Sequence, residues 1–260
     1  MNRDALRSLL VLVGVALVCS ILVSVSTITL RPIQERNEAV QRYRNVVSLT
    51  GLVAPGADDD TILEVVAQLD ARVVDLDTGE FASDLEPGDI DARSAVNDPD
   101  RSTAIPAEAD TARLGRRPNH EVVYLVWQDQ TLSRIIFPIS GQGMWSTIYG
   151  FIALEDDLNT IAAVSFYEQA ETAGLGDQIE DPDWQDQWQG RKMYGPNGEV
   201  RFRVAGGVVS PSSAAAAYEV DGLTGATITG TGVTNLADYW FGPHGYGPFL
   251  KQIGVGAPKR

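Results

Sequence analysis

One segment near the C-terminal end combines small residues with hydroxyl groups. Residues 221–234 read DGLTGATITGTGVT, and Val233, Leu236, Ala237 and Trp240 then recur at helical spacing. Glycine permits unusual φ angles and close approach of a ligand to the backbone. The segment therefore brings a hydroxyl to a helix N-terminus, where free N–H groups and the helix dipole favour a phosphate.

Two common nucleotide-binding loops do not account for this segment. It lacks G-x-x-x-x-G-K-S/T, which excludes a P-loop, and it lacks the strand–helix context of G-x-G-x-x-G. On composition alone, a Gly/Thr turn that precedes a helix and binds nothing stays open as an alternative.

The order of the residues is more informative than their composition. Asp221 to Thr227 reads DGLTGAT and resembles the flavinylation motif D-x-x-S/T-G-A-S/T. In proteins with this motif, a flavin transferase moves FMN from FAD onto the last threonine or serine. The resemblance implies that Thr227 carries FMN through a phosphoester. It also implies that Asp221, Thr224, Gly225 and Ala226 belong to the sequence that the transferase recognises.

Further segments are similar to the C subunit of the Na+-translocating NADH:quinone reductases, which carries covalent FMN. Glu171–Gly176 reads ETAGLG and resembles the family's ETPGLG, with Ala173 where the family usually has proline. This departure should loosen the turn without removing chemistry. Gly242–Lys251 resembles the family's C-terminal ending, and two other segments match as well, Ala71–Glu80 and Gly141–Leu154. The resemblance covers nearly the whole chain.

The resemblance also implies flavin contacts from two of these segments. Aromatic side chains from Gly141–Leu154 would pack on or near the isoalloxazine. Residues from Glu171–Gly176 would contact the ring or the ribityl chain. The residues concerned are Trp145, Tyr149, Glu171, Thr172, Gly174 and Leu175. Core aromatics and a plain turn are the alternatives. For the carboxylates of Asp75 and Asp77 we expect a capped or turn structure.

The N-terminal part of the chain is typical of a membrane anchor. Leu9–Leu30 carries no charge over about 22 residues, and about 20 apolar residues span a bilayer as a helix. A cleaved signal peptide, whose apolar core is usually shorter, is the alternative. Arginines flank both sides, so the positive-inside rule does not settle the orientation. The family resemblance implies a bacterial inner membrane with the large domain on the periplasmic side.

The remaining pattern predicts an α+β protein with a largely antiparallel sheet. We expect a cytoplasmic tail over residues 1–8, a transmembrane helix over 9–30, a stalk helix over 31–50 and an FMN-binding domain over 51–260. Within that domain, helices are predicted over Thr61–Arg72 and Gly230–Phe241, a helical turn over Asp183–Gln189, and an irregular stretch over Gly79–Ala107. The predicted strands are Val122–Trp127, Arg134–Ile139, Thr147–Leu154, Thr160–Tyr167 and Arg201–Val204.

Charge and composition exclude several classes of protein. The net charge of −15 offers no basic surface for nucleic acid. One cysteine, Cys19, cannot form a disulfide within the chain, a Cys-rich zinc site or a Cys-ligated iron–sulfur cluster. With His120 and His244 as the only histidines, we assign no metal ligand and no acid–base or nucleophilic residue.

The resemblance implies an electron-carrier subunit of an enzyme complex that couples NADH oxidation and ubiquinone reduction to Na+ export. This chain would relay electrons through covalent FMN, because it has no nicotinamide-binding fingerprint of its own. Its partners would be the other subunits, the membrane and a flavin transferase. The alternatives are the G subunit of the related Rnf complex, an anchored binding domain without a cofactor, and a stand-alone flavin reductase.

Overall fold

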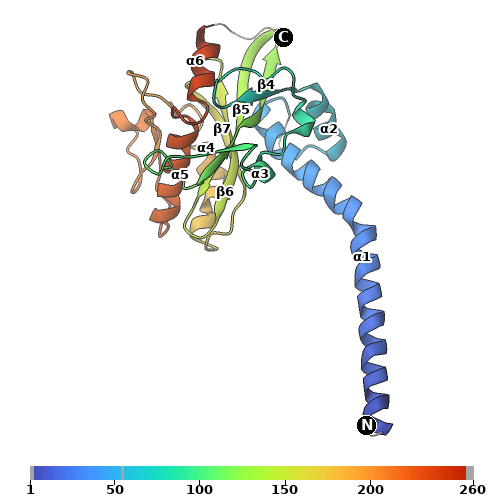
Figure 1. Cartoon of the computed structure of the whole chain (residues 1–260). Coiled ribbons are helices and arrows are strands. Elements are labelled where there is room, and N and C mark those ends of the chain that lie inside the picture. Colours follow the sequence, from blue (N-terminus) through green and yellow to red (C-terminus); the bar gives the residue numbers. More distant parts are fainter. Residues whose placement is uncertain (1–2, 54–55, 256–260) are drawn as a thin grey trace. The chain divides into compact units, whose positions relative to one another are not determined.

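The computed structural model describes residues 3–53 and 56–255 and divides into two compact units, residues 1–44 and 45–260. Helix α1 (Arg3–Thr50) forms the described part of the first unit and supplies the first residues of the second (Figure 1). Residues Leu12–Leu30 have a mean hydropathy of 2.3 and are long and apolar enough to cross a membrane. Residues 31–50, predicted as a stalk helix, continue the same helix.

An antiparallel sheet forms the centre of the second unit. Its strand order is β1-β4-β5-β6-β7. These strands are β1 (Asp70–Asp75), β4 (His120–Gln128), β5 (Thr131–Gln142), β6 (Thr147–Glu155) and β7 (Ile161–Glu168). Because both faces are covered, strand β6 is apolar and buried along most of its length.

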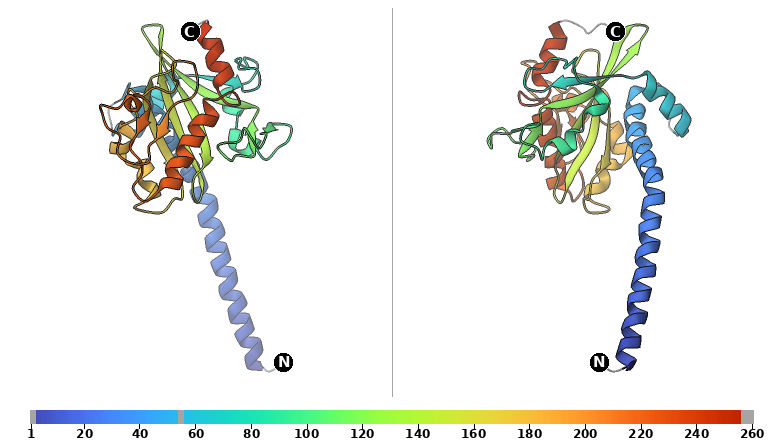
Figure 2. Two further views of the ribbon diagram at one scale, coloured as in Figure 1. Left: turned by 90° about the vertical axis from the view of Figure 1, so that its left-hand side faces the viewer. Right: turned by 45° about the vertical axis from the view of Figure 1, so that its right-hand side comes forward.

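Helices α5 (Thr227–Trp240) and α6 (Gly247–Val255) cover one face of this sheet (Figures 1 and 2). The main core lies between them and the sheet, with Ile148 and Ile152 of β6 packed in one cluster with Val233 and Leu236 of α5. The opposite face carries a smaller back core of Val46, Leu49, Val126, Ile136, Phe151, Ala153 and Ala162. Helix α5 therefore packs on one face of the sheet, and the back core lies on the other face.

Small residues let α5 approach the sheet closely. A Cβ added to Gly232 would lie 2.6 Å from the carbonyl oxygen of Gln142 at the end of β5. At the other end of α5, the indole N–H of Trp240 donates to the carbonyl oxygen of Ser140 at 2.6 Å. The two contacts set the height of α5 along β5, and hence the position of its first residue, Thr227.

Most predicted elements of the second unit are confirmed, with shifted ends. The four long strands lie where expected, and α5 begins three residues earlier than predicted. The helix predicted over Thr61–Arg72 is α2 (Asp59–Gln68), capped by Asp58. Its predicted last residues belong to β1, because Arg72 pairs with Val123 in the sheet. Helix α6 was not predicted.

Short elements occupy the connections between these larger ones. The stretch predicted to be irregular contains three of them, and α4 coincides with the predicted helical turn. They are η1 (Pro87–Asp89), α3 (Ala92–Ala95), β2 (Ser102–Ala104), β3 (Arg116–Pro118), η2 (Gly176–Glu180), α4 (Pro182–Asp186), β8 (Arg203–Val204), η3 (Ala214–Ala217) and β9 (Glu219–Val220).

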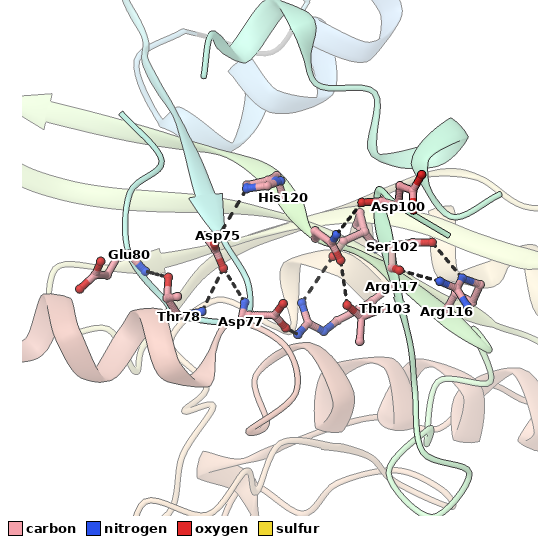
Figure 3. Close-up of polar contacts among 12 residues, drawn as sticks. Asp75, Asp77, Thr78, Glu80, Asp100, Ser102, Thr103, Arg116, Arg117 and His120 are labelled. Atoms are coloured by element: carbon pink, nitrogen blue, oxygen red, sulfur yellow. Dashed lines mark hydrogen bonds and ion pairs between the residues drawn. The ribbon is translucent and has the colours of Figure 1, made fainter. Parts of the chain in front are cut away.

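The turn after β1 is held by carboxylates, as predicted for Asp75 and Asp77 (Figure 3). Asp75 accepts the backbone N–H groups of Asp77 and Thr78 at 2.8 and 3.0 Å, and hydrogen bonding holds its pKa below the ordinary value against the opposing effect of burial. Asp77 pairs with the buried guanidinium of Arg117. The family-like segment Ala71–Glu80 thus consists of the end of β1 and a structural turn.

We predict that Gly232→Ala lowers the free energy of unfolding by about 1–3 kcal/mol, because the added methyl group meets a backbone carbonyl that cannot move without shifting β5. Gly254→Ala in α6 is the matched control, since its Cβ would have 4.0 Å to Leu158 and alanine is the better helix former. Urea unfolding of the full chain in detergent, followed by tryptophan fluorescence, measures both. Equal stabilities for the two variants would contradict the close approach of α5.

Candidate functional site

Thr227 is the first residue of α5, and its side chain is exposed. The residue before it, Ala226, has no side chain that can cap the helix, so no side-chain bond from this position satisfies the first N–H groups of α5. The Thr227 hydroxyl therefore stands on the surface beside the positive end of a 14-residue helix. This arrangement was predicted from the sequence and is confirmed.

Asp221, the first residue of the flavinylation motif, is held by three hydrogen bonds. Its carboxylate accepts the backbone N–H of Val209 at 2.7 Å. Its own N–H donates to the side-chain oxygen of Gln187 at 3.0 Å, and its carbonyl oxygen accepts the indole N–H of Trp184 at 2.8 Å. Both of these side chains come from α4 and the turn that follows it. Asp221 thus anchors the motif to the body of the second unit.

Some of the motif residues between Asp221 and Thr227 are buried, and others are exposed. Leu223 and Ala226 are each 5% exposed and belong to the main core. Thr224 and Gly225 are exposed. Gly225 has a φ of +76°, and a Cβ at this position would lie 2.9 Å from the side chain of Leu175. Glycine is required here both by the left-handed backbone and by the neighbouring side chain.

A loop over residues 171–178 joins this motif to the turn between β5 and β6. The side-chain amide of Gln178 donates to the carbonyl oxygen of Thr224 at 3.2 Å. The indole N–H of Trp145 donates to the hydroxyl of Thr172 at 3.1 Å. The loop therefore links Trp145 to the motif, with Leu175 packed against Gly225 in between.

The buried side chain of Glu171 connects the turn between β5 and β6 to α5. Its carboxylate is 8% exposed and accepts four hydrogen bonds. The donors are the Thr229 hydroxyl at 2.5 Å and the backbone N–H groups of Trp145, Met144 and Ser146 at 2.9, 3.0 and 3.2 Å. Burial opposes ionisation, but these bonds outweigh it and hold the pKa of Glu171 below its ordinary value. We call this arrangement the Glu171 clamp.

Exposed apolar side chains gather on the segments that surround Thr227. Trp145 is 65% exposed, Ile228 55%, Met144 44% and Leu175 40%. Large apolar side chains are normally exposed singly, and several on adjoining segments indicate a ligand or partner surface. The surface suits an aromatic ring system, and the uncapped end of α5 suits its phosphate.

The structure also gives the positions of two other expected contact residues, Tyr149 and Gly174. The side chain of Tyr149 is on the opposite face of the sheet from α5, because its neighbour Ile148 points into the main core. The guanidinium of Arg93 stacks over the Tyr149 ring at 3.7 Å. Gly174 is exposed with a φ of +75° and has nothing within 4 Å of an added Cβ.

The structure therefore brings Trp145, Thr172 and Leu175 to the motif, and it buries Glu171 among donors of the protein itself. Sequence reasoning did not identify Trp184, Gln187, Gln178 or Thr229 as supports of the site. Only the richness of threonine in the motif indicated that hydroxyl groups besides that of Thr227 have partners.

Comparison with known proteins places this site in a described family. Residues 143–242, from the turn before β6 to the end of α5, match the FMN-binding domain family. The chain is 39% identical over 256 residues to the C subunit of the Na+-translocating NADH-quinone reductase of Pseudomonas aeruginosa, covering 98% of each chain. It is 38% identical over 258 residues to the protein of the same name from Pasteurella multocida, covering 98% of this chain and 97% of that protein.

A solved structure agrees with these relatives. The crystal structure of NqrC from Shewanella oneidensis superposes with a TM-score of 0.77 at 33% identity, covering 86% of this chain and all of that one. The fold, the family match across the motif and the near full-length relatives all agree. The chain belongs to the NqrC family, the C subunits of the Na+-translocating NADH-quinone reductases.

Proposed function

We propose that this chain is the subunit of a Na+-translocating NADH:quinone reductase that relays electrons through FMN bound as a phosphoester to Thr227. The observation that carries the proposal is the exposed hydroxyl of Thr227 at the uncapped N-terminus of α5, inside the segment that matches the FMN-binding family. A phosphate joined to this oxygen would lie beside the free N–H groups of the first helical turn.

The surroundings of Thr227 fit such a group. Trp145 and Leu175 offer exposed apolar surface for the flavin ring, and Gly225 leaves room because it has no side chain. The clamp at Glu171 and the bond from Trp145 to Thr172 fix the turn that carries the indole. When bound, FMN supplies the electron-transfer chemistry, and hydrogen bonds, charge and burial from this chain tune it.

A second part of the proposal concerns the place of α1 in the membrane. We propose that residues 9–30 cross the bacterial inner membrane, with residues 1–8 in the cytoplasm and the second unit in the periplasm. The apolar stretch Leu12–Leu30 supports the crossing by its length and composition. A covalent bond would keep the cofactor on a domain that works outside the cytoplasm, where free FMN is scarce.

The partners follow from the division of labour in such a complex. Other subunits would oxidise NADH, reduce ubiquinone and move Na+, and a flavin transferase would attach FMN from FAD. The second unit places the proposed flavin site on its surface and not in its interior, which suits electron exchange with neighbouring subunits.

We predict that Thr227→Val abolishes covalent flavin and leaves the fold intact, because valine keeps the shape but lacks the oxygen that forms the ester. Thr231→Val, one helical turn further along the exposed side of α5, is the matched control and should keep its flavin. Both variants are co-produced with the flavin transferase and run on a denaturing gel that is viewed by flavin fluorescence. A fluorescent Thr227→Val band would refute the proposed attachment.

We predict that Glu171→Gln lowers the free energy of unfolding at pH 7 by about 2–3 kcal/mol, because one amide cannot accept four hydrogen bonds. The lowered pKa means that ionised Glu171 stabilises the fold above its ordinary pKa of 4.5, and that this contribution is lost as the pH falls through the folded-state value. The difference between wild type and variant should therefore shrink in acid.

Urea unfolding at pH 7 and at several lower pH values measures this effect. Glu180→Gln, at an exposed position in η2, is the control and should change stability by less than about 0.5 kcal/mol at every pH. A gap between Glu171→Gln and wild type that does not depend on pH would show that the clamp does not depend on charge.

A further inference from the structure

We propose that the flavin transferase modifies a locally opened form of residues 221–226, and not the closed loop in which the folded domain holds them. The inference rests on the proposed attachment of FMN to Thr227 and concerns how that attachment takes place. It follows from a mismatch between the residues that form the recognition sequence and the residues that the fold leaves accessible.

The first part of the mismatch is Asp221. Its carboxylate is engaged by the N–H of Val209, and both of its backbone polar groups are bonded to side chains, those of Gln187 and Trp184. A transferase that recognises this carboxylate needs donors of its own within hydrogen-bond distance. In the closed loop, the backbone N–H of Val209 already fills one acceptor site of this carboxylate.

The second part is the burial of the residues that follow. Gly222 donates its N–H to the carbonyl oxygen of Gly207 at 2.9 Å, and a Cβ on Gly222 would lie 2.4 Å from the carbonyl oxygen of Ala205. Leu223 and Ala226 lie in the main core. In the folded state the motif thus presents Thr224, Gly225 and Thr227, while Ala226 is buried and Asp221 is half-buried.

The chemistry of attachment also requires space around Thr227. Its Oγ attacks the phosphorus on the FMN half of FAD, and the bond from that phosphorus to the bridging oxygen breaks. AMP leaves with the bridging oxygen and the bonding electrons, and the hydroxyl proton passes to a base of the transferase. Attack and departure lie in line, so the enzyme must surround this phosphorus on both sides. In the closed loop, the side chain of Leu175 packs against Gly225, two residues before Thr227, and opening would release it.

The fold allows the loop to open without losing the domain. The bonds that close it are few and come from Trp184, Gln187, Gln178 and the backbone near Gly207. The rest of α5 is pinned separately, by the close approach at Gly232 and by the bond from Trp240 to β5. Segments closed by few bonds open locally far more often than the whole domain unfolds.

The test measures FMN attachment to the folded apo-protein. Full-length chain produced without the transferase is purified in detergent and mixed with purified transferase and FAD, and intact mass follows the gain of one FMN group with time. Gln187→Ala and Trp184→Phe each remove one bond to Asp221. Each should speed attachment about fivefold, the effect expected of one hydrogen bond on the opening equilibrium.

Tyr246→Phe is the matched control, because it removes one hydrogen bond, from the Tyr246 hydroxyl to the carbonyl oxygen of Pro138 in β5, away from the motif. Its rate of attachment should equal that of wild type. Hydrogen exchange read by mass spectrometry adds a second measurement. The backbone N–H groups of residues 221–226 should exchange faster in Gln187→Ala than in wild type, and those of β5 should not.

The outcomes separate the two proposals. Faster attachment in Gln187→Ala or Trp184→Phe, with Tyr246→Phe unchanged, supports local opening. Equal or slower attachment in both loop variants overturns it, and so does equal acceleration in the control, which would point to global unfolding. If wild type gains no FMN at Thr227 under any condition, the proposed function itself fails.

Discussion

The buried carboxylate of Glu171 is the interaction on which the arrangement around Thr227 depends. It accepts donors from two segments far apart in sequence, the turn that carries Trp145 and the first turn of α5. An ionised carboxylate is the side chain best suited to this task, because it offers four lone-pair sites and no competing donor. Its desolvation is tolerable only because four donors face it, so both segments must be in place together.

The packing of the Glu171 side chain explains why two nearby positions, Gly143 and Gly176, are glycine. A Cβ on Gly143 would lie 2.6 Å from an oxygen of Glu171, and one on Gly176 would lie 2.7 Å from the Glu171 Cβ. The family-like segments around residues 143 and 176 therefore owe part of their sequence to the packing of one carboxylate. Gly232 has a similar effect in α5: because it has no side chain, the end of β5 can approach the helix closely. The structure around Thr227 thus depends on close approaches that lie beneath it.

Much of this was predictable from local pattern, and the remainder depended on long-range partners. Strands such as β6 were predictable because they are rich in β-branched and aromatic residues. The place of Thr227 at a helix N-terminus was predictable from the spacing of the apolar residues that follow it. Glu171 was expected to contact the flavin or to lie in a turn. Its acceptors serve donors 25 to 58 residues away, which no periodicity reveals. Tyr149 reaches the far face because strand alternation, read from Ile148, places it there.

The site divides into a rigid part and a part that is less firmly closed. The clamp and the packing of α5 on β5 hold the apolar surface that would position a flavin, and a redox centre needs this constancy because geometry and burial set its properties. Under the proposed attachment, the loop before Thr227 would have a different task, since a flavin transferase would recognise it once. Holding that loop by a few hydrogen bonds from Gln187 and Trp184, while the clamp and the packing of α5 on β5 fix the rest, lets one short segment serve both needs.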